Sequence, residues 1–206
     1  MLAAALALTL APSLVPGLAQ EPVSVAAPVT GPASKKDAYL AEKAAQPQGR
    51  PARAGQRADA PIWAHNLRTH EIRALTGPAG IPDGPAGAAD RSRFFRCWFT
   101  DEGGPIPATL VARIVAAAEH FEVREVRIIS GFRHPKYNLS LVKKGREVAR
   151  SSQHTEANAI DFFLPGVATR PLYDWLLAVH DGGVGFYPVS EFVHIDRGRK
   201  RTWNGT

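Results

Sequence analysis

The sequence predicts an α+β fold with an antiparallel sheet covered by helices, and three observations lead to it. Two stretches, 107–121 and 171–180, place apolar residues three and four positions apart, as an amphipathic helix requires. Four short apolar runs have the length of strands, at 122–130, 157–164, 184–187 and 192–195. The chain shows no internal repeat, and this mixture of elements indicates one α+β domain.

The first half of the domain is expected to hold an entry strand, a loop and two helices. Residues 63–72 alternate apolar and polar side chains, which predicts the strand, and 77–89 is a loop rich in Gly, Pro and Ala. Residues 91–99 carry an aromatic cluster that we expect to be helical and packed on the core. Pro107 suits the N-terminal position of the next helix, 107–121.

The second half is expected to carry the remaining strands. The strand 122–130 ends in a turn that contains Arg133, and the polar stretch 138–150 predicts a short helix followed by a loop. The run 157–164 predicts a strand that carries Asp161. After the helix 171–180, two further strands are joined by residues 188–191.

The N-terminal third of the 206-residue chain predicts export. Residues 1–19 are apolar and uncharged, and they end in a small-x-small site typical of a cleaved signal peptide. The alternative is an uncleaved anchor, but two prolines and a length under 20 residues disfavour a membrane span. Residues 20–60 contain few large apolar side chains and are interpreted as a flexible linker. The folded domain is therefore expected at 61–206, in a periplasmic or secreted protein without stable membrane insertion after signal cleavage.

Charge and cysteine content limit the possible partners and sites. Cys97 is the only cysteine, so a disulfide within the chain and a cysteine-based zinc site are excluded, and any metal must use His and carboxylate ligands. The net charge of +6 fits an anionic cell envelope, with a solvated basic surface as the alternative. The scattered charges lack the aromatic-and-basic pattern that stacks bases, so no nucleic acid is expected. The sequence does not indicate an oligomeric state.

Two short motifs near the C-terminus carry the chemistry. Ser152-x-His154 is followed by Asp161, and His194-x-Asp196 lies in the last apolar run. Side chains alternate along a strand, so His194 and Asp196 should share one face. Two histidines and a carboxylate can hold one zinc and leave a fourth position open, as catalytic zinc sites do. The alternative for each residue taken alone is a hydrogen-bonded structural role.

Three ordered motifs run through the second half of the domain. They are Ser130-Gly131-Phe132-Arg133-x-Pro135-x-x-Asn138, Ser152-x-His154-x-x-x-x-Ala159-x-Asp161 and Phe192-Val193-His194-x-Asp196-x-Gly198-x-x-Arg201-x-Trp203. Together they resemble the YcbK-like murein endopeptidases, in the zinc D-Ala-D-Ala metallopeptidase group with the hedgehog/DD-peptidase fold. The resemblance covers about residues 60–206. Ala157 stands where the family usually has Gly, and no ligand is lost.

The resemblance implies a zinc enzyme that cleaves peptide cross-links of peptidoglycan, with peptide stems as its substrate. It implies that His154, Asp161 and His194 bind Zn²⁺ and that Arg133 stabilises an oxyanion or holds a substrate carboxylate. The general base stays open between Asp196, which shares the face of His194, and Glu191, which matches the Glu-x-x-His of VanX-type and endolysin relatives. A D-Ala-D-Ala carboxypeptidase or dipeptidase and a non-catalytic wall-binding module are the alternative functions.

Overall fold

A computed structural model describes residues 59–82, 84–144, 149 and 151–205. The predicted signal peptide, 1–19, and all but the last two residues of the predicted linker, 20–60, lie outside this range. Among the described residues, no helix combines the length and the apolar character that a membrane crossing needs.

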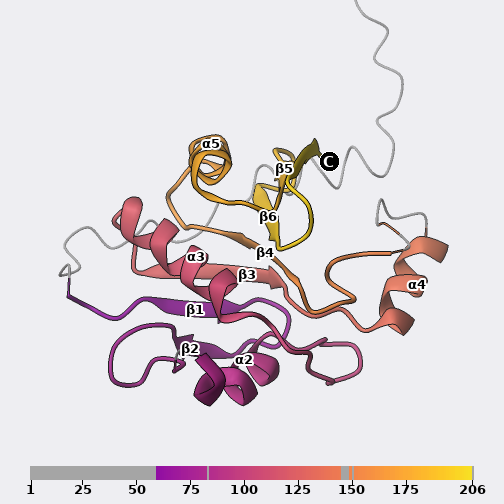
Figure 1. The fold of residues 1–206 in the computed structure, drawn as a ribbon, viewed down its shortest axis with the longest axis horizontal. Helices are drawn as coiled ribbons and strands as arrows, with labels where there is room; N and C mark the ends of the chain where they lie inside the picture. The colour runs from indigo at the N-terminus through magenta and orange to yellow at the C-terminus, as the bar shows by residue number, and fades with distance from the viewer. Residues whose placement is uncertain (1–58, 83, 145–148, 150, 206) are drawn as a thin grey trace, which may run out of the picture.

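A single seven-stranded sheet organises the described part of the chain (Figure 1). Its strands lie in the order β2-β1-β3-β4-β6-β5-β7. The strands are β1 (Trp63–Asn66), β2 (Ile72–Ala74), β3 (Glu125–Ser130), β4 (Ala159–Phe163), β5 (Gly183–Tyr187), β6 (Phe192–Asp196) and β7 (Arg201–Asn204). The helices are the short 3-10 helix η1 (Gly84–Gly87), α2 (Ala88–Phe94), α3 (Ala108–His120), α4 (Pro135–Lys143) and α5 (Thr169–Val179).

The α+β character is confirmed, but the prediction of an antiparallel sheet is wrong because the sheet is mixed. Strand β1 pairs with β3 in parallel, since the connection between them contains α2 and α3 and returns the chain to the same end of the sheet. Strand β7 also pairs in parallel with β5. It was not predicted, because its four residues alternate between partly buried and exposed and carry little apolar signal.

The predicted helices are present with shifted ends. The helix expected at 107–121 is α3, and the one expected at 171–180 is α5. The helix expected at 91–99 ends already at Phe94, in α2. Helix α4 begins before the expected position 138, because the His134 side chain accepts a hydrogen bond from the Lys136 amide at 3.1 Å and caps the helix.

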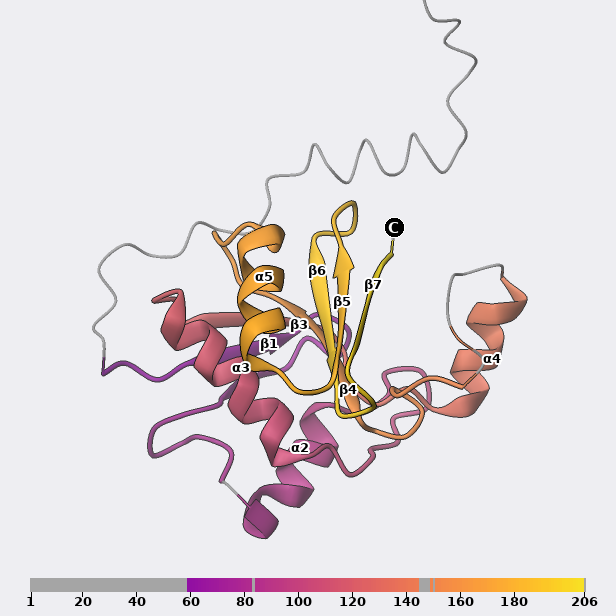
Figure 2. The same ribbon diagram turned by 45° about the horizontal axis from the view of Figure 1, so that its top comes forward.

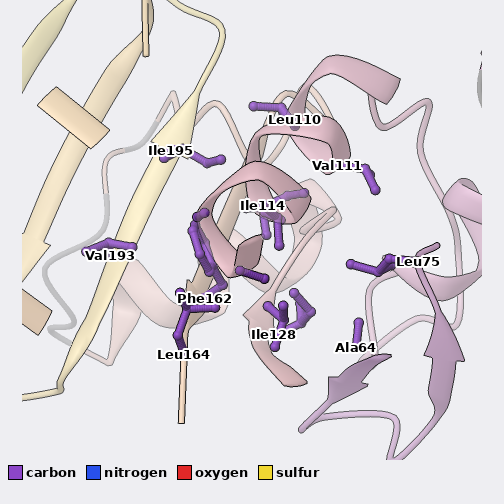
Figure 3. Packing of buried hydrophobic residues seen from close by; sticks show 14 of the residues in the cluster. Ala64, Leu75, Leu110, Val111, Ile114, Ile128, Phe162, Leu164, Val193 and Ile195 are labelled. Carbon is purple, nitrogen blue, oxygen red and sulfur yellow. The ribbon is translucent and has the colours of Figure 1, made fainter. Parts of the chain in front are cut away.

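The hydrophobic core lies between one face of the sheet and the helices α3 and α5 (Figure 2). Phe162 of β4 and Val193 and Ile195 of β6 belong to one buried cluster with Leu110 and Ile114 of α3 (Figure 3). Side chains next to these along each strand point to the opposite face. The alternation therefore turns the polar residues of β4 and β6 away from the core, toward the face that α3 and α5 leave uncovered.

Candidate metal centre

Three buried side chains from two strands and one loop meet on that face. The register of β4 and β6 places Asp161 directly opposite His194, and a carboxylate oxygen of Asp161 lies 2.8 Å from Nδ1 of His194. His154 comes from the turn that precedes β4. Its Nε2 lies 3.1 Å from the other Asp161 oxygen and 3.2 Å from Nδ1 of His194. The exposed fraction is 3% for His154 and 6% for Asp161 and His194.

Each histidine is oriented through the ring nitrogen that points away from the cluster. Nδ1 of His154 donates to the carbonyl oxygen of Gly131 at 2.8 Å, and Nε2 of His194 donates to Oδ2 of Asp196 at 2.9 Å. A neutral imidazole that donates through one nitrogen keeps a lone pair on the other. The lone pairs of His154 Nε2 and His194 Nδ1 therefore point into the space that the Asp161 carboxylate also faces.

The surroundings of His154 and Asp161 favour the deprotonated forms that bind a metal, whereas those of His194 favour the protonated ring. Burial lowers the pKa of His154 and so favours the neutral ring. Burial alone would raise the pKa of Asp161, but His154 and His194 outweigh it and hold that pKa well below its usual range. Burial would likewise lower the pKa of His194, but Asp161 and Asp196 outweigh it and raise the pKa. A metal cation bound between the three side chains would replace the additional proton on the His194 ring.

The arrangement fits a tetrahedral metal ion. The three donor atoms lie within 4.8 Å of one another, and no other group of this kind occurs among the residues that the structure describes. Ligands about 2.0 to 2.1 Å from a tetrahedral zinc are about 3.3 Å apart, close to the separations seen here. Two imidazole nitrogens and one carboxylate oxygen are also a donor set that zinc accepts in catalytic sites.

The turn that carries His154 contains an unusual backbone conformation. Ala157 has a φ of 53°, in the left-handed region that favours glycine. Its amide donates to the His154 carbonyl at 3.2 Å, which closes the turn. The chain therefore keeps a left-handed turn at the position where the sequence has Ala and not Gly, at a cost of about 1 kcal/mol.

Asp196 lies behind His194 as seen from the cluster. Its side chain has no exposed surface. Oδ1 accepts hydrogen bonds from the amides of Gly183 and Gly198 and from the guanidinium of Arg201, which also donates to Oδ2 at 2.8 Å. Burial alone would raise its pKa, but His194 and Arg201 outweigh burial and hold the pKa well below the usual range. The contacts of Gly183 and Arg201 with Asp196 were not predicted from the sequence, where only the Gly198-x-x-Arg201 pattern gave a signal.

Arg133 lies beside the cluster, as the motif order suggested. One guanidinium nitrogen is 3.7 Å from an Asp161 oxygen, and the side chain is largely buried. Its hydrogen bonds to Asn138 and Ser130 are long, at 3.4 and 3.5 Å. The Arg133 backbone amide donates to the His154 carbonyl at 3.0 Å and joins the two loops. Because these hydrogen bonds are long and weak, the guanidinium can still donate stronger hydrogen bonds to an anionic group.

The structure does not bring Glu191 to the cluster. Glu191 is the last residue of the turn between β5 and β6, and its φ of 55° lies in the left-handed region. Its side chain lines a cavity of about 440 Å³ with residues that include Phe186 and Arg170, whereas none of the three clustered residues lines it. The other wall of this cavity is the start of α5, so Glu191 lies toward the helix-covered face of the sheet.

A tryptophan that the sequence analysis left without a role covers His194. Gly185 lies between His194 and Trp203 in the sheet, paired with both. Without a side chain at Gly185, the indole leans across the strand, and its ring centroid lies 5.0 Å from that of His194. The indole Nε1 donates to the hydroxyl of Tyr187 at 3.0 Å. The ring of His194 is therefore held from one side by Trp203 and at its end by Asp196.

These features together define a buried group of two histidines and an aspartate, on the open face of a mixed sheet, that could hold one metal ion. The chain belongs to the Peptidase_M15_2 family, described as peptidoglycan L,D-endopeptidase MepK, whose family model matches residues 85–203. All six residues that the sequence analysis put forward for the site lie within the matched range.

Curated relatives match a shorter region. The chain is 42% identical over 80 residues to the peptidoglycan L,D-endopeptidase MepK of Escherichia coli strain K12, over 39% of the chain and 44% of the relative. It is 38% identical over 81 residues to the probable peptidoglycan L,D-endopeptidase MepK of Haemophilus influenzae strain Rd, over 39% of the chain and 44% of the relative. The aligned region thus spans less than half the length of these relatives. No solved structure matches the chain.

Proposed function

We propose that this chain is a zinc-dependent peptidoglycan endopeptidase that hydrolyses a peptide bond between an L- and a D-configured residue of a cross-link. One observation carries the proposal: His154 and His194 each have one ring nitrogen engaged by an acceptor and the other directed at Asp161. Family membership and the names of the curated relatives support the substrate and the bond type. The hedgehog/DD-peptidase fold and a periplasmic or secreted location belong to the same proposal.

His154 Nε2, His194 Nδ1 and an Asp161 oxygen would hold the metal. When bound, zinc supplies a Lewis acid for the peptide carbonyl and makes a water nucleophilic near neutral pH. The three side chains are nearly buried and already close together, so little reorganisation is needed to bind an ion.

Asp196 is assigned the role of a positioning residue. It accepts the Nε2 proton of His194, which fixes the ring orientation and raises the basicity of Nδ1. Four protein groups surround its two oxygens, so neither oxygen is available to accept a proton from a water at the cluster. The same carboxylate ties β6 to β7 through Arg201.

The role of Glu191 as general base stays a prediction. Its carboxylate has an oxygen that is buried without a hydrogen-bond partner, but its side chain lies with Phe186 and Arg170 away from the cluster. If Glu191 is the base, its replacement by Gln lowers kcat on purified peptidoglycan and leaves zinc affinity unchanged. An unchanged kcat removes Glu191 from the mechanism.

Arg133 is assigned the binding of negative charge on the substrate. Its guanidinium lies beside the metal ligands and has only long hydrogen bonds, so it can reach a stem-peptide carboxylate or the carbonyl oxygen that gains charge. The charge of Arg133 also offsets the repulsion between an anionic substrate and Asp161.

The test is digestion of purified peptidoglycan with separation of the products by mass. The proposal predicts that cross-linked fragments disappear and that matched uncross-linked fragments appear, with no release of single terminal D-Ala residues. A chelator or His154→Ala abolishes the change. Release of D-Ala or of a dipeptide as the main product would support a carboxypeptidase or dipeptidase instead, and no product at all would leave a wall-binding module.

A further inference from the structure

Three neighbouring aromatic side chains, two exposed and one half-buried, form a platform at the start of α4 and the loop after α2. Trp98 and Phe99, in the loop after α2, expose 46% and 47% of their surface. Tyr137, in the first turn of α4, stacks on Phe99 with ring centroids 5.2 Å apart and meets Trp98 edge-on at 5.4 Å. A contiguous exposed group of large aromatic rings is unusual for a surface that binds nothing.

The loop that carries Trp98 and Phe99 is held in place by backbone hydrogen bonds and ion pairs of its flanking residues. The buried Cys97 exchanges backbone hydrogen bonds with Asp101 and Glu102, both at 2.8 Å, which closes the loop. Arg96 pairs with Asp101 and, at 2.7 Å, with Glu71 in the segment that leads into β2. Trp98 and Phe99 at the tip are therefore displayed by an anchored loop, which lowers the entropy cost of binding a ligand there.

The platform is connected to the candidate metal centre. Tyr137 precedes Asn138, a buried residue whose side chain accepts a hydrogen bond from Arg133. Arg133 in turn lies 3.7 Å from Asp161. Helix α4, which carries Tyr137, stands apart from α3 and α5 on the side where the chain leads into β4 (Figure 1). The start of α4 therefore links the platform to Arg133 through Asn138, so a ligand bound to the platform would lie on the Arg133 side of the candidate metal centre.

Two exposed basic side chains border the platform. The guanidinium of the exposed Arg68 lies over the Trp98 ring, 5.9 Å from its centroid. Lys136, next to Tyr137, is exposed as well. The two acidic residues of the loop have partners, since Asp101 pairs with Arg96 and a Glu102 oxygen lies 3.6 Å from Nε2 of His134. The surface therefore offers flat apolar rings bordered by cations, which suits a ligand that has flat C–H faces and carries negative charge.

We propose that Trp98, Phe99 and Tyr137 bind the sugar rings of a peptidoglycan glycan strand while the attached peptide reaches the metal centre. The inference rests on the proposed function, because that function supplies the glycan. The C–H face of a pyranose ring packs on an aromatic face, and the free carboxylate of a neighbouring muramic acid that carries no peptide suits Arg68 and Lys136. A lipid surface is disfavoured, because it needs deeply inserting apolar side chains and these rings are about half buried against one another.

The test is binding of the full chain to glycan strands from which all stem peptides have been removed. Such strands contain no cleavable cross-link, so binding is measured independently of hydrolysis. Trp98→Ala is expected to weaken binding about fivefold or more, the low end of what stacking on an aromatic ring contributes. Trp63→Ala is the matched control, because Trp63 is 43% exposed and lies on β1, outside the platform. Zinc content and the circular dichroism spectrum check that each variant is folded.

A second measurement separates this inference from the proposed function. On a cross-linked peptide without sugars, Trp98→Ala should leave kcat and KM unchanged, whereas on whole peptidoglycan it should raise KM. If wild type does not hydrolyse peptidoglycan but binds bare glycan with the same dependence on Trp98, the inference stands and the proposed function fails. If wild type does not bind bare glycan, or if Trp98→Ala and Trp63→Ala weaken binding equally, the inference is overturned. A change of oligomeric state in Trp98→Ala without glycan binding would assign the platform to a second copy of the chain.

Discussion

Replacing Asp196 with asparagine separates its positioning role from that of a general base. If the amide oxygen takes the place of Oδ1 and keeps the amides of Gly183 and Gly198, the amide nitrogen faces two donors, His194 Nε2 and Arg201. Two hydrogen bonds to a charged acceptor are then lost, each worth about 1.5 to 3 kcal/mol. Because Arg201 is partly exposed and regains some hydration, the net loss should be about 2 to 4 kcal/mol.

Two assays measure the consequences of this change. In thermal unfolding with a chelator present, Asp196→Asn should lower Tm by roughly 5 to 15 °C, from about 2 to 4 °C per kcal/mol for a domain of this size. In competition with a chromophoric chelator, zinc affinity should fall about 10- to 100-fold, because His194 loses the acceptor that fixes its tautomer. Asp174→Asn is the matched control, since Asp174 pairs with Arg170 on the exposed surface of α5 and should contribute little.

The outcome distinguishes the two roles of Asp196. A variant that binds zinc as tightly as wild type and unfolds at the same temperature would refute the positioning role. If such a variant also lost kcat, Asp196 would act directly in proton transfer.

Three further predictions concern neighbouring residues. Arg133→Lys should lower kcat/KM about 100-fold or less with zinc content unchanged, because a lysine cannot reproduce the planar guanidinium; an unaltered kcat/KM would exclude Arg133 from substrate binding. Gly185→Ala should weaken zinc binding, because its Cβ would lie 2.7 Å from the Trp203 ring that packs on His194; unchanged affinity would show that the indole does not hold the ligand. Burial lowers the pKa of His180, so His180 contributes stability above the unfolded pKa of about 6.5 that is lost as pH falls below it. The loss of stability between about pH 7.5 and about pH 5.5, with a chelator present, should therefore be smaller in His180→Gln than in wild type.

Much of the site could be predicted because it follows from local periodicity. Asp161 and His194 lie in apolar strands, and a polar residue at alternate positions of a buried strand marks the face that does not join the core. The same parity placed Asp196 on the side of His194, whereas Glu191 precedes β6 in a turn, where strand parity does not apply. Which strands pair, and in which direction, depends on contacts far apart in sequence, so the parallel pairings of β1 with β3 and of β5 with β7 were not predicted.

The supporting contacts of the site could not be predicted, because they use backbone atoms or small residues. Gly131 holds His154 through its carbonyl oxygen, and the amide of Gly183 donates to Asp196. Gly185 acts by having no side chain, which lets Trp203 reach His194. None of these roles leaves a pattern in a single sequence, since any residue carries a backbone carbonyl and glycine also occurs in ordinary turns.

Activity as a function of added zinc tests the central claim most directly. Protein stripped of metal should not cleave peptidoglycan cross-links, and activity should rise linearly with zinc and level off at about one ion per chain, as a single three-ligand site requires. His154→Ala should show no such rise. Full activity of the stripped protein, or a rise that His154→Ala shares with wild type, would contradict the assignment of His154, Asp161 and His194 as the zinc ligands of a peptidase.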